Sequence, residues 1–449
     1  MERDTALALA PAAAEPRSDL FDALLVIAIF AGMGMLAWGA VATPLLAPLF
    51  EIVERGHWHL LWLRPLVIWI GMGLVLMLGR TVFWLCYRPF ASAGAEEAPL
   101  ISVVIPAYNE GAMVEVAIAS VALARYPRAR LEIIAVDDGS TDDTWRYIAR
   151  AAQRFPELVT PVRLERNQGK RAALAAGFRR ARGDVVVTVD SDSEIEPQTL
   201  AAIAGPFRDP RIGAVAGKVA VHNRHAGLIP RMLHVRFVLS FDFLRSAQSF
   251  FRTVYCCPGA LAAYRMSVVR AVLPQWERQR FLGTECTYGE DRALTNCILA
   301  AGYDTVYQRS AVVHTLVPET YTRLCRMYLR WDRSYIREEL HFARVVWKRP
   351  PLWRALAMYE STVTNLRFPV AYLSIGLMVG HALRDPASIL RMLVAIMVVS
   401  LVYVLYYLRS ERSWDFVFGI LYAYFSFFAL TWIFPYAALT LRARGWLTR

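Results

Sequence analysis

Long apolar segments lie near both ends of the chain. Residues 23–50 contain no charged residue, and residues 65–87 contain only one, close to an end of the segment. Residues 392–408 and 416–441 are also free of charge, and residues 368–383 form a shorter apolar segment. A helix needs about 20 apolar residues to cross a bilayer. The pattern therefore predicts two spans before the middle of the chain and at least three after it.

The middle of the chain, roughly residues 98–350, alternates short apolar runs with helical patterns. Residues 100–110, 131–137 and 185–189 are typical of buried strands, and helical spacing follows each of the first two. Such alternation predicts βαβ units and a mostly parallel sheet, whose ligands bind beyond the carboxyl ends of the strands. Polar clusters follow these strands each time, so we predict one site that contains the following residues: Asn109, Glu110, Asp137, Asp138, Asp190 and Asp192.

Asp190 and Asp192 are separated by one serine at the end of a predicted core strand. Turn residues and helix N-caps would account for an isolated pair of this kind. The alternative is a divalent ion that is held by carboxylate oxygens and by the phosphates of a substrate. Gly169, Lys170 and Arg171 favour the second interpretation, because two cations at a predicted helix start are unfavourable unless an anion binds there. A solvated basic patch is the plainer alternative for them.

Glu290 and Asp291 begin a later helical pattern, either as N-cap residues or as a general base for an acceptor hydroxyl. Six arginines then follow at helical spacing, beside an aromatic face that includes Trp331: Arg323, Arg326, Arg330, Arg333, Arg337 and Arg344. This face could lie on anionic lipid. Arg330 and Trp331 instead suit a pyrophosphate and a sugar ring, because a guanidinium binds phosphate oxygens in pairs and an indole offers a flat apolar surface.

Composition and net charge indicate which kinds of molecule the protein binds. The 449 residues are 56% hydrophobic and carry a net charge of +12, so anionic lipid and a phosphorylated substrate are favoured over nucleic acid. The six cysteines show no metal-ligand spacing. The positive-inside rule places the middle domain in the cytoplasm, with Arg88, Arg409 and Arg412 on that side. Three C-terminal spans would leave Arg442, Arg444 and Arg449 outside, which a fourth crossing or a re-entrant segment would correct.

Taken in order, six motifs resemble a known family: "DDGS", "NQGKRAAL", "DSD", "PGALAAYR", "GEDRALTN" and "RWDRSYIRE". The chain resembles the processive, membrane-embedded family 2 glycosyltransferases, and within that family it is similar to hyaluronan synthases and to the chitin-oligosaccharide synthases of nodulation. The resemblance covers the whole chain and implies a Rossmann-like GT-A domain, an α/β fold with a mostly parallel sheet, inserted between transmembrane helices.

The resemblance also implies roles for the donor side of the site. The uridine of a UDP-sugar would be contacted by Asp137 and Asp138 and bordered by Tyr108, Asn109 and Glu110. Lys170 would lie near the phosphates, with Arg171 beside it, and Asp190 and Asp192 would hold Mg²⁺ or Mn²⁺.

On the acceptor side, the resemblance implies that Asp291 is the catalytic base, next to Glu290. Gly259 would belong to the acceptor loop, Arg330 would meet the diphosphate and Trp331 would stack against the acceptor sugar. The sequence departs from the family pattern at two positions in this region. Met327 replaces the usual glutamine before the Arg-Trp pair, and Ala260 replaces the usual proline after the glycine.

We therefore predict two transmembrane helices in residues 1–97, the cytosolic GT-A domain in 98–320, interfacial amphipathic helices in 321–365 and channel-forming transmembrane helices in 366–449. The predicted enzyme is a multi-pass protein of the plasma (inner) membrane. It would polymerise UDP-GlcNAc, alone or alternating with UDP-glucuronate, onto a growing β-linked glycan and export the product. One alternative is a single-transfer glycosyltransferase that uses a lipid-phosphate acceptor, and another is a sugar-nucleotide-gated export subunit.

Overall fold

The computed structural model describes residues 19–42, 65–383 and 385–443 of the chain. The central part is an eight-stranded sheet in the order β3-β2-β1-β4-β7-β6-β10-β5. The bounds are β1 Ile101–Ala107, β2 Leu131–Asp137, β3 Val159–Arg163, β4 Val185–Val189, β5 Ser193–Ile195, β6 Ile212–Val221, β7 Leu261–Arg265 and β10 Asp304–Thr315. Every residue of β1 and β2 is buried, as expected for strands that are covered on both faces.

The sheet is mostly parallel. Strand β1 runs parallel to β2 and β4, β2 to β3, and β6 to β10. Strand β7 is antiparallel to β4 and β6, and β5 is antiparallel to β10. A separate two-stranded hairpin consists of β8 Arg280–Phe281 and β9 Thr284–Glu285. Because β1, β2 and β4 are parallel neighbours, their carboxyl ends lie at one edge, where the polar clusters follow them.

Helices surround the sheet. Those of the sheet domain are α4 Met113–Ala122, α5 Thr144–Arg154, α6 Lys170–Arg180, α7 Thr199–Ala204, α8 Leu228–Val238, α9 Ser246–Phe250, α10 Met266–Glu277 and α11 Glu290–Ala300. A π-helical stretch, Leu239–Arg245, joins α8 to α9. Short 3₁₀ turns complete the domain at Arg128–Arg130 and Gly205–Arg208.

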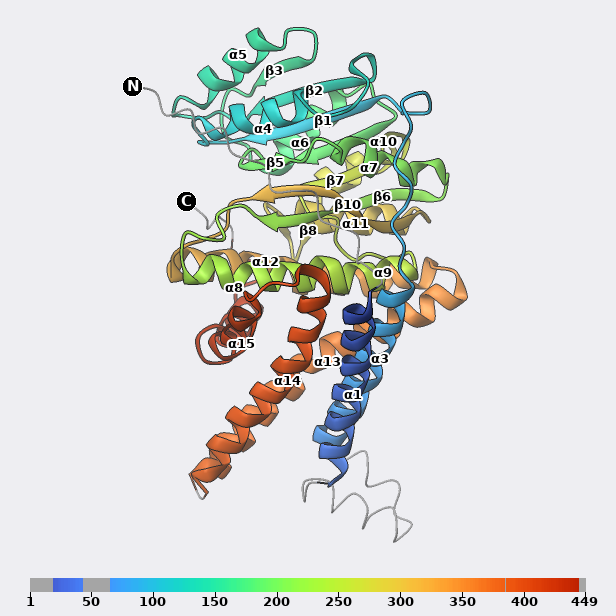
Figure 1. The fold of residues 1–449 in the computed structure, drawn as a ribbon. Coiled ribbons are helices and arrows are strands. Elements are labelled where there is room, and N and C mark those ends of the chain that lie inside the picture. Colours follow the sequence, from blue (N-terminus) through green and yellow to red (C-terminus); the bar gives the residue numbers. More distant parts are fainter. Residues whose placement is uncertain (1–18, 43–64, 384, 444–449) are drawn as a thin grey trace, which may run out of the picture.

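The remaining helices extend away from the sheet domain. Helix α12 (Tyr321–Val345) lies across one side of the domain, and α1, α3 and α14 project beyond it (Figure 1). Their bounds are α1 Leu20–Ala42, α3 Pro65–Cys86, α13 Pro351–Ala382, α14 Ala387–Glu411, α15 Phe416–Phe425 and α16 Ile433–Leu439. The 3₁₀ turn Val346–Lys348 joins α12 to α13, and the π-helical stretch Ser426–Leu430 follows α15. The boundary predicted between residues 320 and 321 falls at the start of α12, whereas the boundary between 365 and 366 lies inside α13.

Fewer helices meet the criteria for a membrane span than the sequence pattern predicted. Within the described residues, Leu20–Gly39 and Met392–Glu411 are long and apolar enough to cross a membrane. The apolar segment at 416–441 is not one straight helix, because Phe416–Leu430 and Ile433–Leu439 meet at 43°, as in a broken span or a re-entrant loop. The part of α3 from Gly71 to Cys86 is apolar but shorter. Residues 43–50 of the first predicted span and Arg444 and Arg449 lie outside the described residues.

Candidate active site

The loops after β1 and β2 are joined by hydrogen bonds. The backbone N–H of Asn109, which has φ of 53°, donates to Ser140 Oγ at 3.0 Å. Asn109 Oδ1 accepts from the N–H of Thr141 at 2.9 Å, and the N–H of Glu110 donates to Thr144 Oγ1 at 2.8 Å. These bonds fix the loop at the edge of the sheet. The neighbouring Tyr108 ring is 36% exposed there, so it is accessible to a ligand.

Two acids at the end of β2, Asp137 and Asp138, hold the neighbouring loops in place. Asp137 is fully buried, accepts from the N–H of Ser140 at 2.9 Å, and lies 3.3 Å from Arg163 Nε. Asp138 accepts from the N–H groups of Gln168 and Gly169, both at 2.8 Å. Burial raises the pKa of Asp138, although these two donors oppose the shift. Asp138 therefore fixes the turn that leads into α6.

Helix α6 brings Lys170 to the centre of the site. Gly169 precedes it with φ of 91°, in the region that favours glycine. Lys170 Nζ forms an ion pair with Asp190 and lies 3.5 Å from Glu290 Oε1. The ammonium group thus connects the acid after β4 with the acid that begins α11, although these acids are 100 positions apart in the sequence.

Arg171 does not join this cluster. Its side chain is buried, donates to the carbonyl of Trp276 at 2.5 Å, and lies over the Trp276 ring at 5.2 Å. The Arg171 side chain therefore points away from the cluster, contrary to the prediction that it contacts substrate. The reason is helix geometry, because successive residues at a helix start project about 100° apart and only one of them can face the cleft.

Asp190 and Asp192 lie close enough for their charges to interact. Burial, together with the nearby carboxylates of Asp190 and Glu110, raises the pKa of Asp192 to about 6, although Lys170 opposes the shift. The described residues contain no group of three or more His, Cys, Asp or Glu side chains that could hold a metal. Two carboxylates suffice where substrate phosphates supply the remaining oxygens, as is usual for Mg²⁺. A bound cation would also relieve the repulsion between the carboxylates.

Glu290 and Asp291 begin α11 in contrasting environments. Burial alone would raise the pKa of Glu290, but the positive charge of Lys170 lowers it. This acid is therefore ionised and faces the ammonium group. Burial and the charge of Glu290 raise the pKa of Asp291. Asp291 Oδ2 accepts from the N–H of Gly259 at 3.3 Å and lies 3.6 Å from Cys256 Sγ. The pKa values of the two acids are therefore shifted in opposite directions, upwards for Asp291 and downwards for Glu290.

Glycines allow the backbone to approach these side chains. A Cβ at Gly259 would lie 2.9 Å from Lys170 Nζ and 3.6 Å from Asp190 Oδ1. Gly289 has φ of 75°, and a Cβ there would lie 2.7 Å from Ser334 Cβ on α12. The close contact at Gly289 ties the start of α11, and hence the two acids, to α12. Hydrogen bonds to Thr320 define the start of α12 itself.

Helix α12 places Arg330 near Glu290 and Trp331 beside other aromatic rings. The charge of Arg330 lowers the pKa of Glu290, a smaller effect than that of Lys170. The Trp331 ring is 42% exposed and lies 6.3 Å from the Phe237 ring and 5.6 Å from the Tyr328 ring. An accessible indole of this kind offers a stacking surface. Met327, at the position where the family has glutamine, is buried in the core.

The arginine face of α12 divides into two parts. Arg323, Arg326 and Arg344 are exposed, whereas Arg333 and Arg337 are each only 5% exposed. Arg333 Nη2 donates to Thr440 Oγ1 at 2.8 Å, and Arg337 Nη2 donates to the carbonyl of Tyr288 at 2.6 Å. The two buried arginines are thus bound to protein groups.

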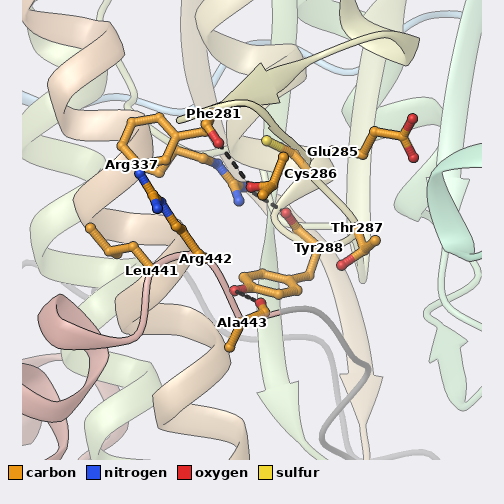
Figure 2. A pocket seen from close by; sticks show the side chains of 10 residues that line it. Phe281, Glu285, Cys286, Thr287, Tyr288, Arg337, Leu441, Arg442 and Ala443 are labelled. Atoms are coloured by element: carbon orange, nitrogen blue, oxygen red, sulfur yellow. Dashed lines mark hydrogen bonds between the residues drawn. The ribbon is translucent and has the colours of Figure 1, made fainter.

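The C-terminal segment reaches the loop that precedes the acids. Tyr288 Oη donates to the carbonyl of Ala443 at 3.1 Å, and Leu441 and Arg442 line the same small pocket beside Arg337 (Figure 2). No sequence pattern indicated this contact. Sequence reasoning also missed the buried ion pair of Lys218 with Asp242 at 2.8 Å. A lysine within the otherwise apolar strand β6 was an available signal for that pair.

Comparison with known proteins identifies the class. Residues 102–273 match the family described as Glycosyl transferase family 2. The chain is 31% identical over 351 residues to an N-acetylglucosaminyltransferase from Azorhizobium caulinodans, which covers 78% of this chain and 87% of the relative. It is 31% identical over 386 residues to a hyaluronan synthase from Streptococcus pyogenes, which covers 84% and 88% of the two chains.

Among solved structures, the fold is similar to a mannosyltransferase from Pyrobaculum calidifontis in complex with GDP-Man and Mn²⁺. The TM-score is 0.56 at 22% identity, over 91% of this chain and 98% of that one. The fold is therefore a mixed α/β GT-A fold with a mostly parallel sheet. The chain belongs to glycosyl transferase family 2 and is a glycosyltransferase. These findings confirm the predicted family, fold class and enzyme class.

Proposed function

We propose that the protein is a processive, inverting glycosyltransferase that polymerises a UDP-sugar into a β-linked glycan and exports it across the plasma (inner) membrane. The observation that carries the proposal is the position of Lys170, which joins Asp190 to Glu290 directly beside Asp291. A nucleotide-binding group and a candidate base thus share one cluster. Relatives that are named N-acetylglucosaminyltransferase support UDP-GlcNAc as the donor, which is used alone or in alternation with UDP-glucuronate.

The residues have distinct tasks in this reaction. Asp291 accepts the proton of the acceptor hydroxyl, for which its raised pKa suits it. The acceptor oxygen then attacks the anomeric carbon from the face opposite UDP, the bond to UDP breaks, and the configuration inverts. Lys170 and Arg330 stabilise the negative charge that develops on the leaving diphosphate.

Asp190 and Asp192 would hold Mg²⁺ or Mn²⁺ together with the diphosphate. When bound, the cation would neutralise charge on the diphosphate and so favour its departure. Tyr108, Asn109 and Glu110, with Asp137 and Asp138 behind them, border the pocket that we assign to the uridine. Trp331 stacks against the acceptor sugar, and Gly259 lets the backbone of the acceptor loop approach Lys170.

The membrane part of the proposal places the sheet domain in the cytoplasm, and the product would leave between the membrane helices.

Purified protein is incubated with UDP-GlcNAc, UDP-glucuronate and UDP-glucose, singly and in pairs, with Mg²⁺ or Mn²⁺. We expect UDP release and a ladder of long chains. Absence of UDP release with every donor would reject the proposal. A single sugar on a lipid would replace it with a single-transfer reaction.

A further inference from the structure

The first turn of α6 contains a buried arginine that has no task in the proposed reaction. Arg171 follows Lys170 and is 6% exposed, and within the described parts of the chain it forms no ion pair with a carboxylate. Its Nε and Nη2 atoms are buried and have no hydrogen-bond partner among the described residues. Burial lowers the pKa of Arg171, although the charge of Glu290 opposes the shift. A cation held in this way is costly, so we looked for a role that would compensate for the cost.

The partner of Arg171 is Trp276, in the last turn of α10. Arg171 Nη1 donates to the carbonyl of Trp276 at 2.5 Å, and its guanidinium lies 5.2 Å from the centroid of the Trp276 ring. Phe178 lies two turns further along α6, and its ring centroid is 5.9 Å from that of Trp276. Helix α6 therefore holds both the backbone and the ring of Trp276, which is 1% exposed.

The indole of Trp276 in turn holds the start of α11. Its Nε1 donates to the carbonyl of Glu290 at 2.8 Å, and Asp291 is the next residue in the first turn of that helix. An indole N–H can only donate, and it projects from a rigid ring, so this bond fixes the position of the backbone at Glu290. A series of contacts thus leads from the residue after Lys170 to the residue before Asp291.

This series of contacts joins the phosphate side of the proposed reaction to the base. Lys170 also pairs with Asp190 and lies 3.5 Å from Glu290, but a lysine side chain is flexible and does not fix the distance between two helices. The path through Arg171 and Trp276 uses a stacked guanidinium, a backbone carbonyl and a rigid ring instead. A misplacement of about 1 Å can lower a rate about 100-fold, so this distance matters.

We propose that Trp276 and Arg171 are positioning residues for the transfer step. Trp276 holds Asp291 at its working distance from Lys170 through the carbonyl of Glu290, and Arg171 holds Trp276. Neither of the two residues touches the substrate. The inference rests on the proposed function, because it takes Asp291 as the base and Lys170 as a ligand of the diphosphate. It also explains why a second cation stands at the start of α6 although it faces away from the cluster.

Trp276→Phe tests the bond to Glu290, because it keeps an aromatic ring and removes the N–H donor. With UDP-GlcNAc as the donor, we expect kcat for UDP release to fall about 10- to 100-fold while KM changes less than about 2-fold. In the Asp291→Asn background, the same substitution should change the residual rate less than about 2-fold, because no base remains to be positioned. A loss of folded protein would instead lower the rate equally in both backgrounds.

Arg171→Met separates positioning from stability. Methionine is flexible and apolar and needs no hydrogen-bond partner, so the melting temperature should not fall, whereas kcat should fall about 10-fold. Arg179→Gln is the matched control, because it removes an exposed ion pair between the same two helices, formed by Arg179 and Glu277. Exposed pairs contribute little, so this variant should keep both its melting temperature and its kcat.

Several outcomes would overturn the inference. A normal kcat in Trp276→Phe or in Arg171→Met would do so, as would equal rate losses from Trp276→Phe with and without Asp291. A loss that appears in KM rather than in kcat would also do so, and this comparison does not depend on the residual rate of Asp291→Asn. Failure of the proposed function looks different, since the unaltered protein would then release no UDP, or Asp291→Asn would keep its full rate.

Discussion

Gly289→Ala tests whether the contact between α11 and α12 positions Asp291, the base that we propose. Gly289 has φ of 75°, which costs a residue with a side chain roughly 1–2 kcal/mol. The added Cβ would also lie 2.7 Å from Ser334 Cβ and 2.8 Å from Arg337 Nη2. Overpacking of this kind costs about 1–3 kcal/mol. Together we expect a loss of about 2–5 kcal/mol, with part of it relieved by displacement of Glu290 and Asp291.

The assay combines thermal melting of the purified protein with the rate of UDP release. A displacement of about 1 Å at the base can lower the rate about 100-fold, so we expect UDP release to fall at least 10-fold while UDP binding changes little. The added substitution Ser334→Gly should recover part of the stability and of the rate, because it removes one of the two clashing groups. A double-mutant cycle then measures the coupling between the two positions.

Gly302→Ala is the matched control for backbone strain. Gly302 follows α11 with φ of 91°, and a Cβ there would meet no atom within 4 Å. This variant should lose stability only through its strained backbone conformation, and its rate of UDP release should not change. If Gly289→Ala loses no more stability than Gly302→Ala and transfers sugar at the rate of the unaltered protein, then α12 does not position Asp291.

Three further predictions concern the acids. Asp291→Asn should reduce UDP release at least 100-fold yet leave UDP binding unchanged. Turnover at the normal rate would show that Asp291 is not the base. Chelation with EDTA should abolish transfer and added Mg²⁺ or Mn²⁺ should restore it, whereas activity that resists EDTA would contradict the role of Asp190 and Asp192. Glu338 is buried, which by itself raises its pKa, but His341 and Arg337 beside it hold the pKa at about 2 against the usual 4.5. Ionised Glu338 therefore stabilises the fold above pH 4.5 by about 3 kcal/mol at most, and this contribution is lost as the pH falls towards 2. Melting curves should show Glu338→Gln to be less stable at pH 7, with the difference shrinking below pH 4.5; a difference that does not depend on pH would contradict the assignment.

Sequence patterns were sufficient to bring the donor side of the site together. Polar residues that follow parallel strands must meet at one edge of the sheet, because βαβ connections give neighbouring strands the same direction. The register of β1 on β2 pairs Ala107 with Asp137, so the loop that begins at Tyr108 had to lie beside Asp138. The same reasoning brought Asp190 to that edge through the parallel pairing of β4 with β1.

Tertiary structure decided what the patterns left open. Helical spacing assigns residues to a common face but does not identify what covers that face. Arg333 and Arg337 share a face with the exposed Arg326, yet they are buried against Thr440 and Tyr288, which come from distant parts of the chain. Likewise, apolarity marked residues 416–441 as a possible span but could not reveal the 43° bend within it.

The sequence by itself determined which side chains gather at the edge of the sheet, because βαβ units make the strands parallel and bring their carboxyl ends to the same edge. Only the folded chain decided that Lys170 faces two acids while Arg171 faces Trp276, and that the pKa is raised for Asp291 but lowered for Glu290. Those differences arise from burial and from charges brought together by residues far apart in the sequence, which no local pattern records.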